Sequence, residues 1–354
     1  MNKQKVVLAS VLKPIDDTRM FRKMGYSLAT TGLYNVNIIG FKAKPPIGIS
    51  NISFHPIFEF NRISFSRLIC GIRYYKQPKK LRPELIIITT HELIWPSIIY
   101  KLIYRAKLIY DVQENHFRNI LFTNSFPLLI RPILACWVRS KEYIFSLFFN
   151  QFFLAEKYYK NELNFIGNRA VVIENKALEV AQNNRLVSSN LNEKIRLIFS
   201  GTLAESTGVF DAINLAKKLY RINNNIRLII IGYSPKKSVI SKIESLIKTD
   251  DFIELKGGNS LVNHSSILEA IGASDFGIIN YPHNKSTINS TPTKLYEYLS
   301  MELPIIVQPH PEWASICAPY DAHLTVDFND LQPELLLEKM LSTTLQRIGS
   351  YFQI

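Results

Sequence analysis

The sequence predicts an α/β fold of two domains, each a doubly wound parallel sheet with helices on both faces. Three observations support this prediction. Short apolar runs alternate with segments of helical period in both halves of the chain. At 354 residues the chain exceeds the usual size of a single hydrophobic core. Between the two halves, residues 181–193 are polar and rich in Asn and Ser, as linkers are.

Residues 1–180 form the first predicted domain. Its strand-like apolar runs are residues 6–10, 35–41, 85–91, 107–112, 152–154 and 171–175. Helical periodicity covers residues 95–104 and residues 21–31, where Gly32 suits the position just after the helix. The run at residues 6–10 is too short for the core of a signal peptide, so it is predicted as the first strand.

Residues 128–154 are apolar and aromatic, with basic residues such as Arg139 and Lys141 among them. One interpretation is one or two helices that face the core. The other is a basic and aromatic face against a membrane surface. Pro132 and Glu142 interrupt the segment and favour the core-facing interpretation.

Residues 194–335 form the second predicted domain. Its expected strands are residues 195–201, 227–232, 252–257, 276–280 and 305–307. Its expected helices are residues 209–220, 240–248 and 267–274, and a short helix after Pro292. A closing helix starts near Leu331, and residues 336–354 form a C-terminal helix that could return to the first domain.

The stretch of residues 290–307 is the most informative part of the chain. Thr291 can cap a helix that has Pro292 in its first turn, where unpaired N–H groups suit an anion. Lys294 adds a positive charge, and Glu297 lies three residues on, on the same face. The segment therefore offers amides and an ammonium group for phosphates, and a carboxylate for sugar hydroxyls. The alternative is an ordinary amphipathic helix in which Lys294 and Glu297 are a solvated pair.

Ligands bind doubly wound sheets at the carboxyl ends of the strands, and two such domains are expected to face each other across a cleft. In the first domain these ends carry Asp16, Asp17, Arg19, His91 and Asp111. In the second domain they carry Ser200, Gly201, Thr202, Gly232, Tyr281, Lys294 and Glu297. Because Gly201 and Gly232 are single glycines, they do not form a dinucleotide-binding fingerprint, which weighs against an oxidoreductase.

The composition bounds the class of partner. The chain has 42 Lys and Arg against 29 Asp and Glu, a net charge of +13. This excess favours an anionic partner such as a nucleotide or an acidic membrane surface, and no nucleic-acid-binding module is recognisable. The three cysteines are far apart, which favours a reducing compartment over a disulfide framework. No apolar run is long enough to cross a bilayer, so we expect a cytoplasmic protein.

Several segments, taken in order, resemble those of the GT-B superfamily of nucleotide-sugar glycosyltransferases, most closely the group classed as family 4. They are residues 16–21 (DDTRMF), 110–115 (YDVQEN), 199–203 (FSGTL) followed by Gly208, and 291–298 (TPTKLYEY) with 303–306 (LPII). The resemblance covers nearly the whole chain. Each motif is weak alone, and their order and spacing make the group fairly specific.

The resemblance implies that the second domain binds a nucleotide sugar, such as a UDP- or GDP-sugar, with no further cofactor and no metal ion. Glu297 would hydrogen-bond the ribose hydroxyls, and Lys294 and the amides near Thr291 and Thr293 would hold the diphosphate. A lysine and a helix N-terminus can stabilise the leaving-group charge that a metal would otherwise take. His264 either contacts the nucleotide base or lies at the surface.

The chain departs from the family's pattern at three positions. The first Glu of the family's Glu-x7-Glu pair falls at Asn289, where the carboxylate would contact the transferred sugar. The Arg and Lys that often follow the first strand of the donor domain fall at Thr202 and Thr207. Lys294 could compensate, Arg19 could reach across the cleft, or the protein could be a degenerate partner subunit.

An inverting transfer needs a base that takes the proton of the acceptor hydroxyl. The main candidates are Asp17, His91 and Asp111, and two further ones are Glu114 and His116. His91 fits equally well as a histidine bonded to nearby backbone, and Asp111 as a cap on the following turn. Asp17 could instead cap a helix beside Arg19.

We therefore expect a hexosyltransferase that moves a sugar from a nucleotide diphosphate to a glycan or a lipid-linked glycan in surface polysaccharide biosynthesis. A lipid-linked acceptor would place it as a peripheral protein at the inner face of the cell membrane. Two other classes stay open. One is a sugar-nucleotide epimerase on the same fold, and the other is a non-catalytic glycosyltransferase-like subunit.

Overall fold

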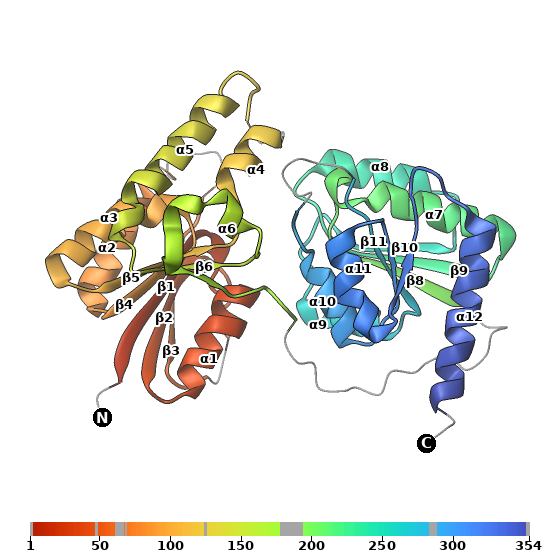
Figure 1. The fold of residues 1–354 in the computed structure, drawn as a ribbon, viewed down its shortest axis with the longest axis horizontal. Helices are drawn as coiled ribbons and strands as arrows, with labels where there is room; N and C mark the ends of the chain where they lie inside the picture. The colour runs from red at the N-terminus through yellow and green to blue at the C-terminus, as the bar shows by residue number, and fades with distance from the viewer. Residues whose placement is uncertain are drawn as a thin grey trace. The chain divides into compact units, whose positions relative to one another are not determined.

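The computed structural model describes residues 3–46, 49–60, 67, 69–123, 126–177, 194–282 and 289–351. The chain divides into unit 1, Met1–Asn175, and unit 2, Lys176–Ile354, which are coloured along the sequence in Figure 1. This division lies close to the predicted domain boundary at residue 180. The predicted linker, residues 181–193, falls outside the described residues.

Unit 1 is built on a parallel sheet of seven described strands in the order β3-β2-β1-β4-β5-β6-β7. The strands are β1 (Gln4–Pro14), β2 (Tyr34–Phe41), β3 (Ile52–Phe58), β4 (Leu85–Ile88), β5 (Lys107–Val112), β6 (Gln151–Leu154) and β7 (Ala170–Val172). β1 pairs with β2 on one side and with β4 on the other. Continuous Val, Ile and Leu runs give the central strands no polar face, and such strands are stable only when both faces are covered.

Helices cover both faces of this sheet (Figure 1). They are η1 (Thr18–Gly25, a π-helix), α1 (Tyr26–Thr30), α2 (Cys70–Leu81), η3 (His91–Leu93), α3 (Ile94–Tyr104), α4 (His116–Phe122), α5 (Arg131–Phe145), η4 (Ser146–Phe148), α6 (Tyr159–Glu162) and η5 (Asn164–Arg169). Met20 of η1 packs with Leu8 on one face, in one hydrophobic cluster. Tyr74 of α2 and Ile98 of α3 pack with Val7 on the other face.

Unit 2 repeats this plan with six described strands in the order β10-β9-β8-β11-β12-β13, again all parallel. The strands are β8 (Ile195–Thr202), β9 (Ile226–Tyr233), β10 (Ile253–Gly258), β11 (Phe276–Ile279), β12 (Ile305–Val307) and β13 (His323–Thr325). The helices are η6 (Glu205–Thr207), α7 (Val209–Ile222), α8 (Lys237–Ile247), α9 (His264–Gly272), α10 (Thr293–Ser300), α11 (Pro311–Cys317), η7 (Ala318–Tyr320) and α12 (Pro333–Tyr351).

Two hydrophobic clusters lie on the two faces of the unit 2 sheet. One contains buried residues of α7, α8 and α12, and the other contains buried residues of α9, α10 and α11. Leu336, Leu337 and Met340 of α12 are buried in the first of these clusters. The buried side chains of α12 therefore contribute to the core of unit 2. That the end of this helix returns to the first domain stays a prediction.

The predicted doubly wound architecture is confirmed in both units, and the bounds of β5 and β12 match the predicted ranges. Among the described α-helices and strands, six have no counterpart in the prediction: β3, α2, α4, α6, α11 and β13. β3 and α2 each contain a proline, at Pro56 and Pro78, and β13 has only three residues. Their sequences therefore lack the continuous apolar run or clean helical period on which the prediction depends.

The favoured interpretation of residues 128–154 as core-facing helices is wrong for α5. The buried residues of this helix are Ala135, Val138, Lys141 and Glu142. Its large apolar side chains lie outside, and Ile133, Trp137, Tyr143 and Ile144 are each more than half exposed. An ordinary surface helix has the opposite arrangement, with its apolar side toward the core.

Candidate functional site

The strand order marks one switch point in each sheet. In unit 2 the chain passes from β8 to β9 on one side, while β11 lies on the other side of β8. In unit 1, β1 stands in the same relation to β2 and β4. Ligands of doubly wound sheets bind beyond the carboxyl ends of the strands at such points. The candidate sites are therefore the ends of β8 and β11 in unit 2, and of β1 and β4 in unit 1.

The carboxyl end of β8 has a bare backbone surface. Gly201 has a φ of +100°, and a Cβ atom built on it would meet no heavy atom within 4 Å. At Gly232, on β9, a Cβ atom would lie 1.7 Å from the carbonyl oxygen of Gly201. A side chain at position 232 would push the two strand ends apart, so this position requires glycine. Thr202, the next predicted ligand residue, is exposed.

The helix α10 lies beside these strand ends and begins at Thr293. Its N-cap residue is Pro292, one residue after the predicted cap Thr291. The hydroxyl group of Tyr298 is 2.9 Å from Oγ of Ser200 and accepts a hydrogen bond from the Ser200 N–H at 3.2 Å. These bonds fasten α10 to the end of β8.

Lys294, on the first turn of α10, is buried, and its Nζ has no hydrogen-bond partner among the described residues. Nζ lies 4.0 Å from the centroid of the Phe199 ring and 5.3 Å from that of the Tyr281 ring. Cation–π contacts offset part of the desolvation cost. Burial still lowers the pKa of Lys294 to about 7, and the carboxylate of Glu297 opposes this shift. The structure thus holds an ammonium group ready to pair with an anion.

Glu297 makes no ion pair with Lys294. Its Oε1 is instead 2.9 Å from Nε2 of His264, the first residue of α9, and no described residue donates to its Oε2. Nδ1 of His264 is buried and has no partner among the described residues. The interpretation of Lys294 and Glu297 as a solvated pair is therefore wrong, because one is buried and a histidine holds the other.

The entry to α10 is fixed by α11. Nε1 of Trp313 donates a hydrogen bond to the carbonyl oxygen of Ser290 at 3.1 Å, and the Trp313 ring meets that of Tyr281 at 5.9 Å between centroids. The N–H of Tyr281 donates to Oε1 of Gln308 at 2.8 Å. Burial raises the pKa of Tyr281 above its usual range. Together these contacts hold the end of β11 and the segment that carries Thr291 next to Lys294.

The positions that depart from the family's pattern supply no positive charge. The Oγ1 of Thr207 donates to the carbonyl oxygen of Thr202 at 2.8 Å and accepts from the N–H of Ala204 at 3.1 Å. Thr207 therefore closes the turn after β8. Asn289 lies four residues before α10 and is the first described residue after Pro282.

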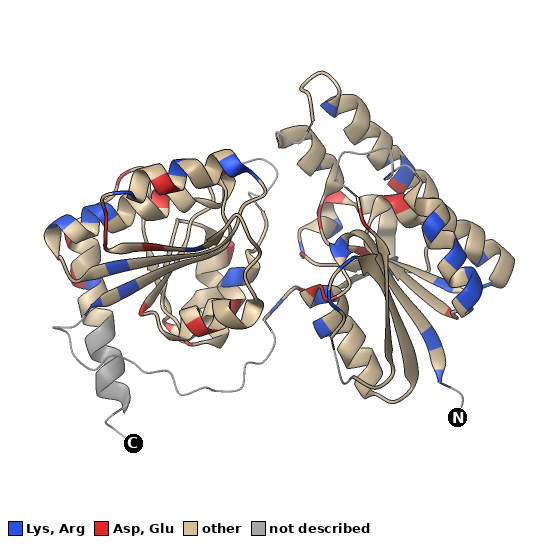
Figure 2. Ribbon diagram, turned by 180° about the vertical axis from the view of Figure 1, so that it is seen from behind, with Lys and Arg blue, Asp and Glu red and all other residues tan. Residues whose placement is uncertain are grey.

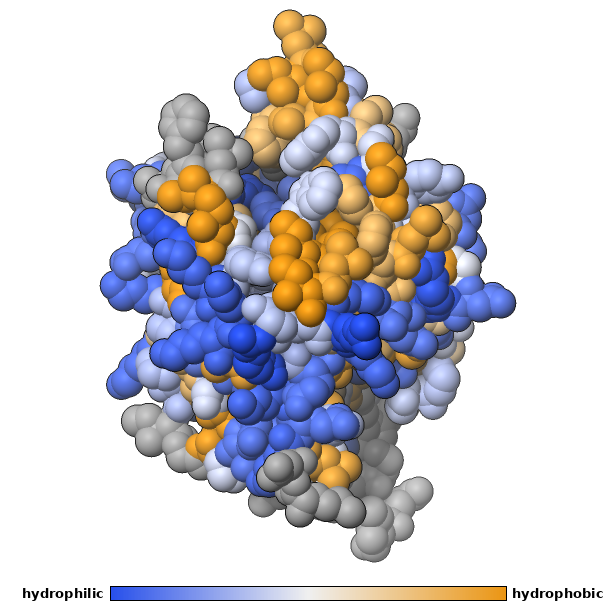
Figure 3. All heavy atoms as spheres, turned by 90° about the vertical axis from the view of Figure 1, so that its left-hand side faces the viewer, coloured by the Kyte–Doolittle hydropathy of each residue, from blue (hydrophilic) through white to orange (hydrophobic). Residues whose placement is uncertain are grey.

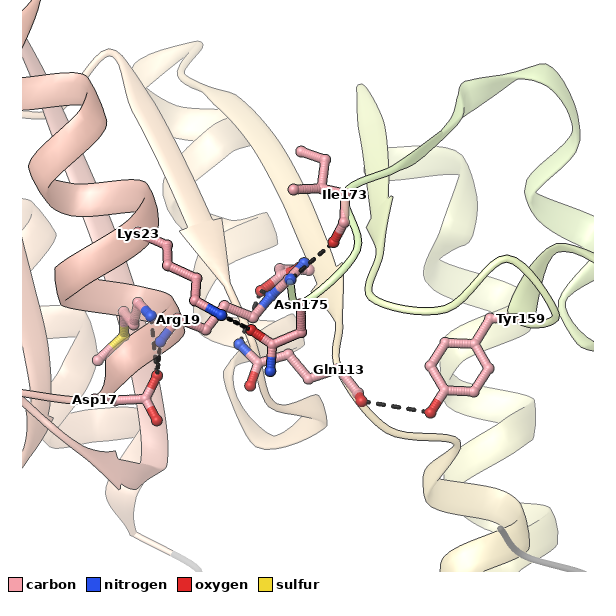
Figure 4. Close-up of polar contacts among 9 residues, drawn as sticks. Asp17, Arg19, Lys23, Gln113, Tyr159, Ile173 and Asn175 are labelled. Atoms are coloured by element: carbon pink, nitrogen blue, oxygen red, sulfur yellow. Dashed lines mark hydrogen bonds and ion pairs between the residues drawn. The ribbon is translucent and has the colours of Figure 1, made fainter. Parts of the chain in front are cut away.

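In unit 1, Asp111 is fully buried at the end of β5 and forms a two-point ion pair with Arg19. Nη2 of Arg19 is 2.7 Å from Oδ1, and Nε is 3.0 Å from Oδ2. Nη1 of the same arginine donates to the carbonyl oxygen of Ile173 at 2.8 Å (Figure 4). Both carboxylate oxygens are occupied, so the geometry disfavours Asp111 as a base. The idea that Arg19 reaches toward a ligand is not supported either, because its guanidinium group already binds Asp111 and the carbonyl oxygen of Ile173 within unit 1.

Asp17 is the N-cap of η1. Its Oδ1 accepts hydrogen bonds from the N–H groups of Arg19 at 3.1 Å and Met20 at 2.9 Å (Figure 4). Nζ of Lys23, one turn further on, donates to Oδ1 of Asn175 at 2.7 Å. The arrangement matches the alternative interpretation of Asp17 as a cap beside Arg19.

His91 follows β4 at the unit 1 switch point. Its Nδ1 is 2.9 Å from Nζ of Lys141, and its ring is edge-on to His116 and Trp137, with centroids 5.2 Å and 6.3 Å away. The alternative of a histidine bonded only to backbone is therefore not observed. Burial lowers the pKa of His91 to about 3. Glu114, the remaining candidate, accepts a hydrogen bond from Asn119 at 3.0 Å.

Sequence reasoning does not identify Lys141 or Trp137 as site residues. The available signal is the adjacent pair Lys141 and Glu142 inside an apolar segment, one helical turn from Trp137. Lysine on a helix usually points to solvent. Only the packing of α5 shows that Lys141 instead points to the end of β4.

No protein-family model matches the chain, and no curated protein matches it by sequence. Solved structures do match. One is the sucrose-phosphate synthase from Thermosynechococcus elongatus, with 12% identity and a TM-score of 0.66 over 98% of this chain and 90% of the other. Another is the catalytic domain of starch synthase IV from Arabidopsis thaliana bound to ADP and acarbose, with 11% identity and a TM-score of 0.61 over 100% and 92%.

A third similar structure is a provisionally named UDP-N-acetylglucosamine 2-epimerase from Listeria monocytogenes. It shares 13% identity and has a TM-score of 0.56 over 98% of this chain and 88% of the other. Together with the two parallel sheets, these similarities show that the chain has the GT-B fold of two Rossmann-like domains. At such identities the similarity establishes the fold and not the activity.

Proposed function

We propose that the chain is a glycosyltransferase that binds a nucleoside diphosphate sugar at unit 2 and transfers the sugar to a glycan or lipid-linked glycan. The observation that carries this proposal is Lys294, a buried ammonium group without a hydrogen-bond partner among the described residues, at the switch point of a doubly wound sheet. The similar starch synthase domain, solved with ADP, supports a nucleotide ligand for this fold. The thermal midpoint of unfolding, measured with and without nucleotides, tests this proposal.

In the proposed reaction the acceptor hydroxyl oxygen attacks the anomeric carbon, and the bond from that carbon to the diphosphate oxygen breaks. The hydroxyl proton leaves to a base, and negative charge develops on the departing nucleoside diphosphate. Lys294 and the N–H groups at the start of α10 would stabilise this charge without a metal ion. Because Phe199 and Tyr281 enclose Lys294, binding requires its ammonium group to move toward the phosphates.

Glu297 is the proposed ligand of the ribose hydroxyls. His264 holds its Oε1, which leaves Oε2 to accept a hydrogen bond from a hydroxyl group. Nδ1 of His264 has no partner among the described residues but is buried, so a hydrogen bond from the nucleotide base to this atom would require a local movement that exposes it. Gly201 offers the open backbone surface on which the nucleotide would lie.

The thermal midpoint of the protein should rise with one nucleotide family among UDP, GDP, CDP and ADP and their sugars, because a ligand that binds only the folded state stabilises it. At 100 times the dissociation constant the stabilisation is about 2.7 kcal/mol. Lys294→Ala and Glu297→Ala should each remove the rise. A panel with no rise for any nucleotide would contradict the proposed donor site.

The main alternative is an epimerase that converts a nucleotide sugar without an acceptor, in keeping with the similar Listeria structure. A second alternative is a non-catalytic subunit, which the neutral residues Thr202, Thr207 and Asn289 favour. Release of free nucleoside diphosphate only after addition of an acceptor glycan supports the transferase. Release without acceptor favours the epimerase, and tight binding without release favours the subunit.

We also propose that unit 1 binds an anionic membrane surface through α3, α5, the segment before α5 and η4. The exposed large apolar residues there are Trp95, Ile99, Leu102, Ile103, Leu128, Leu129, Ile130, Ile133, Trp137, Tyr143, Ile144 and Leu147. Figure 3 shows apolar side chains gathered on the upper half of one side of the molecule, above hydrophilic ones. So many exposed apolar groups on adjacent elements are unusual for a protein without a partner surface.

Charge complementarity favours a membrane as that partner. α2 packs beside α3 and exposes Arg73, Lys76, Lys79 and Lys80. Lys and Arg positions occur throughout both units, so the excess charge is not a single nucleic-acid stripe (Figure 2). No helix among the described residues is long and apolar enough to cross a bilayer, so the contact would be interfacial.

Co-sedimentation with anionic vesicles at low salt should pull down the protein, and Leu129→Glu and Ile133→Glu should each weaken binding at least about tenfold. Leu261→Glu is the matched control, since Leu261 of unit 2 is 82% exposed but lies on no such surface. Absence of binding at low salt would contradict the membrane proposal.

A further inference from the structure

The inward side of α5 carries two charged residues that reach different partners. Glu142 accepts a hydrogen bond from the hydroxyl group of Tyr110 at 2.9 Å and lies 3.6 Å from Nη1 of Arg139. Lys141 instead places its Nζ 2.9 Å from Nδ1 of His91 and 4.4 Å from the centroid of the Trp137 ring. Lys141 makes no ion pair within 4.0 Å among the described residues, so its principal polar contact is the imidazole.

The chemistry of the two groups determines where the imidazole proton lies. A lysine ammonium group has three donors and no acceptor. At 2.9 Å from Lys141, Nδ1 of His91 therefore accepts, and a neutral imidazole must then carry its proton on Nε2. His91 stays neutral because burial, the charges of Lys141 and Arg67, and His116 lower its pKa to about 3, against the opposing charge of Glu92.

Nε2 of His91 points away from this contact. No described residue forms a hydrogen bond with this atom, and the atom is not fully buried. It therefore remains open to solvent or to a ligand. Because His91 follows β4, this atom lies at the switch point where unit 1 is expected to bind its ligand.

We propose that Lys141 is a positioning residue that fixes His91 with its proton on Nε2, so that His91 donates a hydrogen bond to a carbohydrate hydroxyl oxygen and does not act as a base. The identity of the ligand rests on the proposed function, whereas the tautomer does not. The exposed ring of Trp137 beside His91 gives the sugar an apolar surface to stack on. The proposal replaces the predicted role of His91 as the base.

The arrangement depends on the charge of Lys141. Burial lowers the pKa of Lys141 to about 8, while Glu92, Glu142 and Cys70 raise it and Arg67 lowers it further. Below this pH the ammonium group donates and the Nε2–H tautomer is fixed. Above it, the neutral amine can accept a hydrogen bond from Nδ1–H, so the tautomer preference should relax as the pH rises from 7 to 10.

Nitrogen NMR of the whole protein with ¹⁵N-labelled histidine tests the proposal without any substrate. The signal of His91 can be assigned from ring-to-ring nuclear Overhauser contacts with His116 and Trp137, with no substitution required. We expect a neutral imidazole with its proton on Nε2 from pH 5 to 7. A wild-type His91 that titrates near its usual pKa, or that carries its proton on Nδ1, overturns the proposal.

Lys141→Met should raise the pKa of His91 and populate both tautomers. It should also raise the acceptor KM more than it lowers kcat, and leave the nucleotide-induced thermal shift unchanged. Lys101→Met is the matched control, because Lys101 is a partly buried lysine of unit 1 that bonds Phe148 and Asn150 instead. If His91 in the Lys141→Met variant still carried its proton only on Nε2, the proposal would also be overturned. If nucleotides did not raise the thermal midpoint of the unsubstituted protein, only the proposed function would be contradicted.

Discussion

At the scale of single residues, Lys294 has a burial and charge that stability alone does not explain. Its folded-state pKa of about 7 lies below the ordinary value of 10.5. The folded protein therefore binds fewer protons than the unfolded chain between these values, so stability should increase with pH across that window. Below pH 7 the full cost of the buried charge is present. A residue that destabilises the free protein in this way is expected where a ligand supplies the missing counter-charge.

Lys294→Met should therefore stabilise the protein at pH 7 by on the order of 2 kcal/mol and abolish nucleotide binding. Urea unfolding at several pH values measures both the gain and the loss of pH dependence. Lys242→Met is a suitable control, since Lys242 lies 4.4 Å above the Phe210 ring but is exposed. A destabilised Lys294→Met would show that the ammonium group has a structural role.

Nucleotide binding should take up protons near pH 8, because a diphosphate raises the pKa of Lys294 from about 7 toward its ordinary value. Affinity should accordingly be constant below pH 7 and fall by up to about tenfold per pH unit above it. Calorimetry in two buffers with different ionisation enthalpies measures this uptake. Equal heats in both buffers at pH 8 would mean that Lys294 does not change its protonation on binding.

Asp111→Asn should lower the free energy of unfolding by about 3–5 kcal/mol, because it leaves the buried guanidinium of Arg19 without its counter-charge. Glu59→Gln breaks the exposed pair with Lys42, whose side chains are 69% and 62% exposed, and should cost less than about 1 kcal/mol. Chemical denaturation compares the two. A fully stable but inactive Asp111→Asn protein would restore Asp111 as a candidate base.

At the scale of elements, the sequence predicted correctly those strands whose pattern of apolar residues is unambiguous. Buried parallel strands are continuous apolar runs, so β1, β5 and β8 can be read directly from the sequence. α5 failed because an apolar helix is expected to face the core, and here the packing overrides that expectation. The N-cap of α10 differed by one residue, which is within the usual uncertainty of helix ends.

The attachment of α10 to the sheet gives a prediction at this scale. A Cβ atom at Gly277 of β11 would lie 2.4 Å from the ring of Tyr298, so Gly277→Ala must displace that ring and with it α10. We expect a loss of about 1–3 kcal/mol in stability and weaker nucleotide binding. Gly272→Ala is the control, since its Cβ would meet only the flexible end of Met301 at 3.4 Å. Equal effects of the two substitutions would contradict this account.

At the scale of the whole molecule, the sequence contained enough information to predict the two-sheet architecture, whereas the strand order that marks the switch points comes from the structure. The sequence could not show which polar side chains are already occupied. Asp111 and His91 both lie at the ends of predicted strands, yet Asp111 is neutralised by Arg19 and His91 contacts Lys141, and both partners come from distant segments. Such pairings depend on the packing of helices against the sheet, which local sequence patterns do not encode.

The two proposed ligands should protect different units from hydrogen exchange. A nucleotide should slow exchange at the carboxyl end of β8 and in α10, whereas anionic vesicles should slow it in α3 and α5, because ligands suppress local opening where they bind. Mass spectrometry of peptides from each unit measures both effects in the full chain. Lys294→Ala should remove the first effect alone, and Ile133→Glu should weaken only the second. If the nucleotide protected unit 1 and did not protect α10, the donor would bind unit 1 and the assignment of the two sites would be refuted.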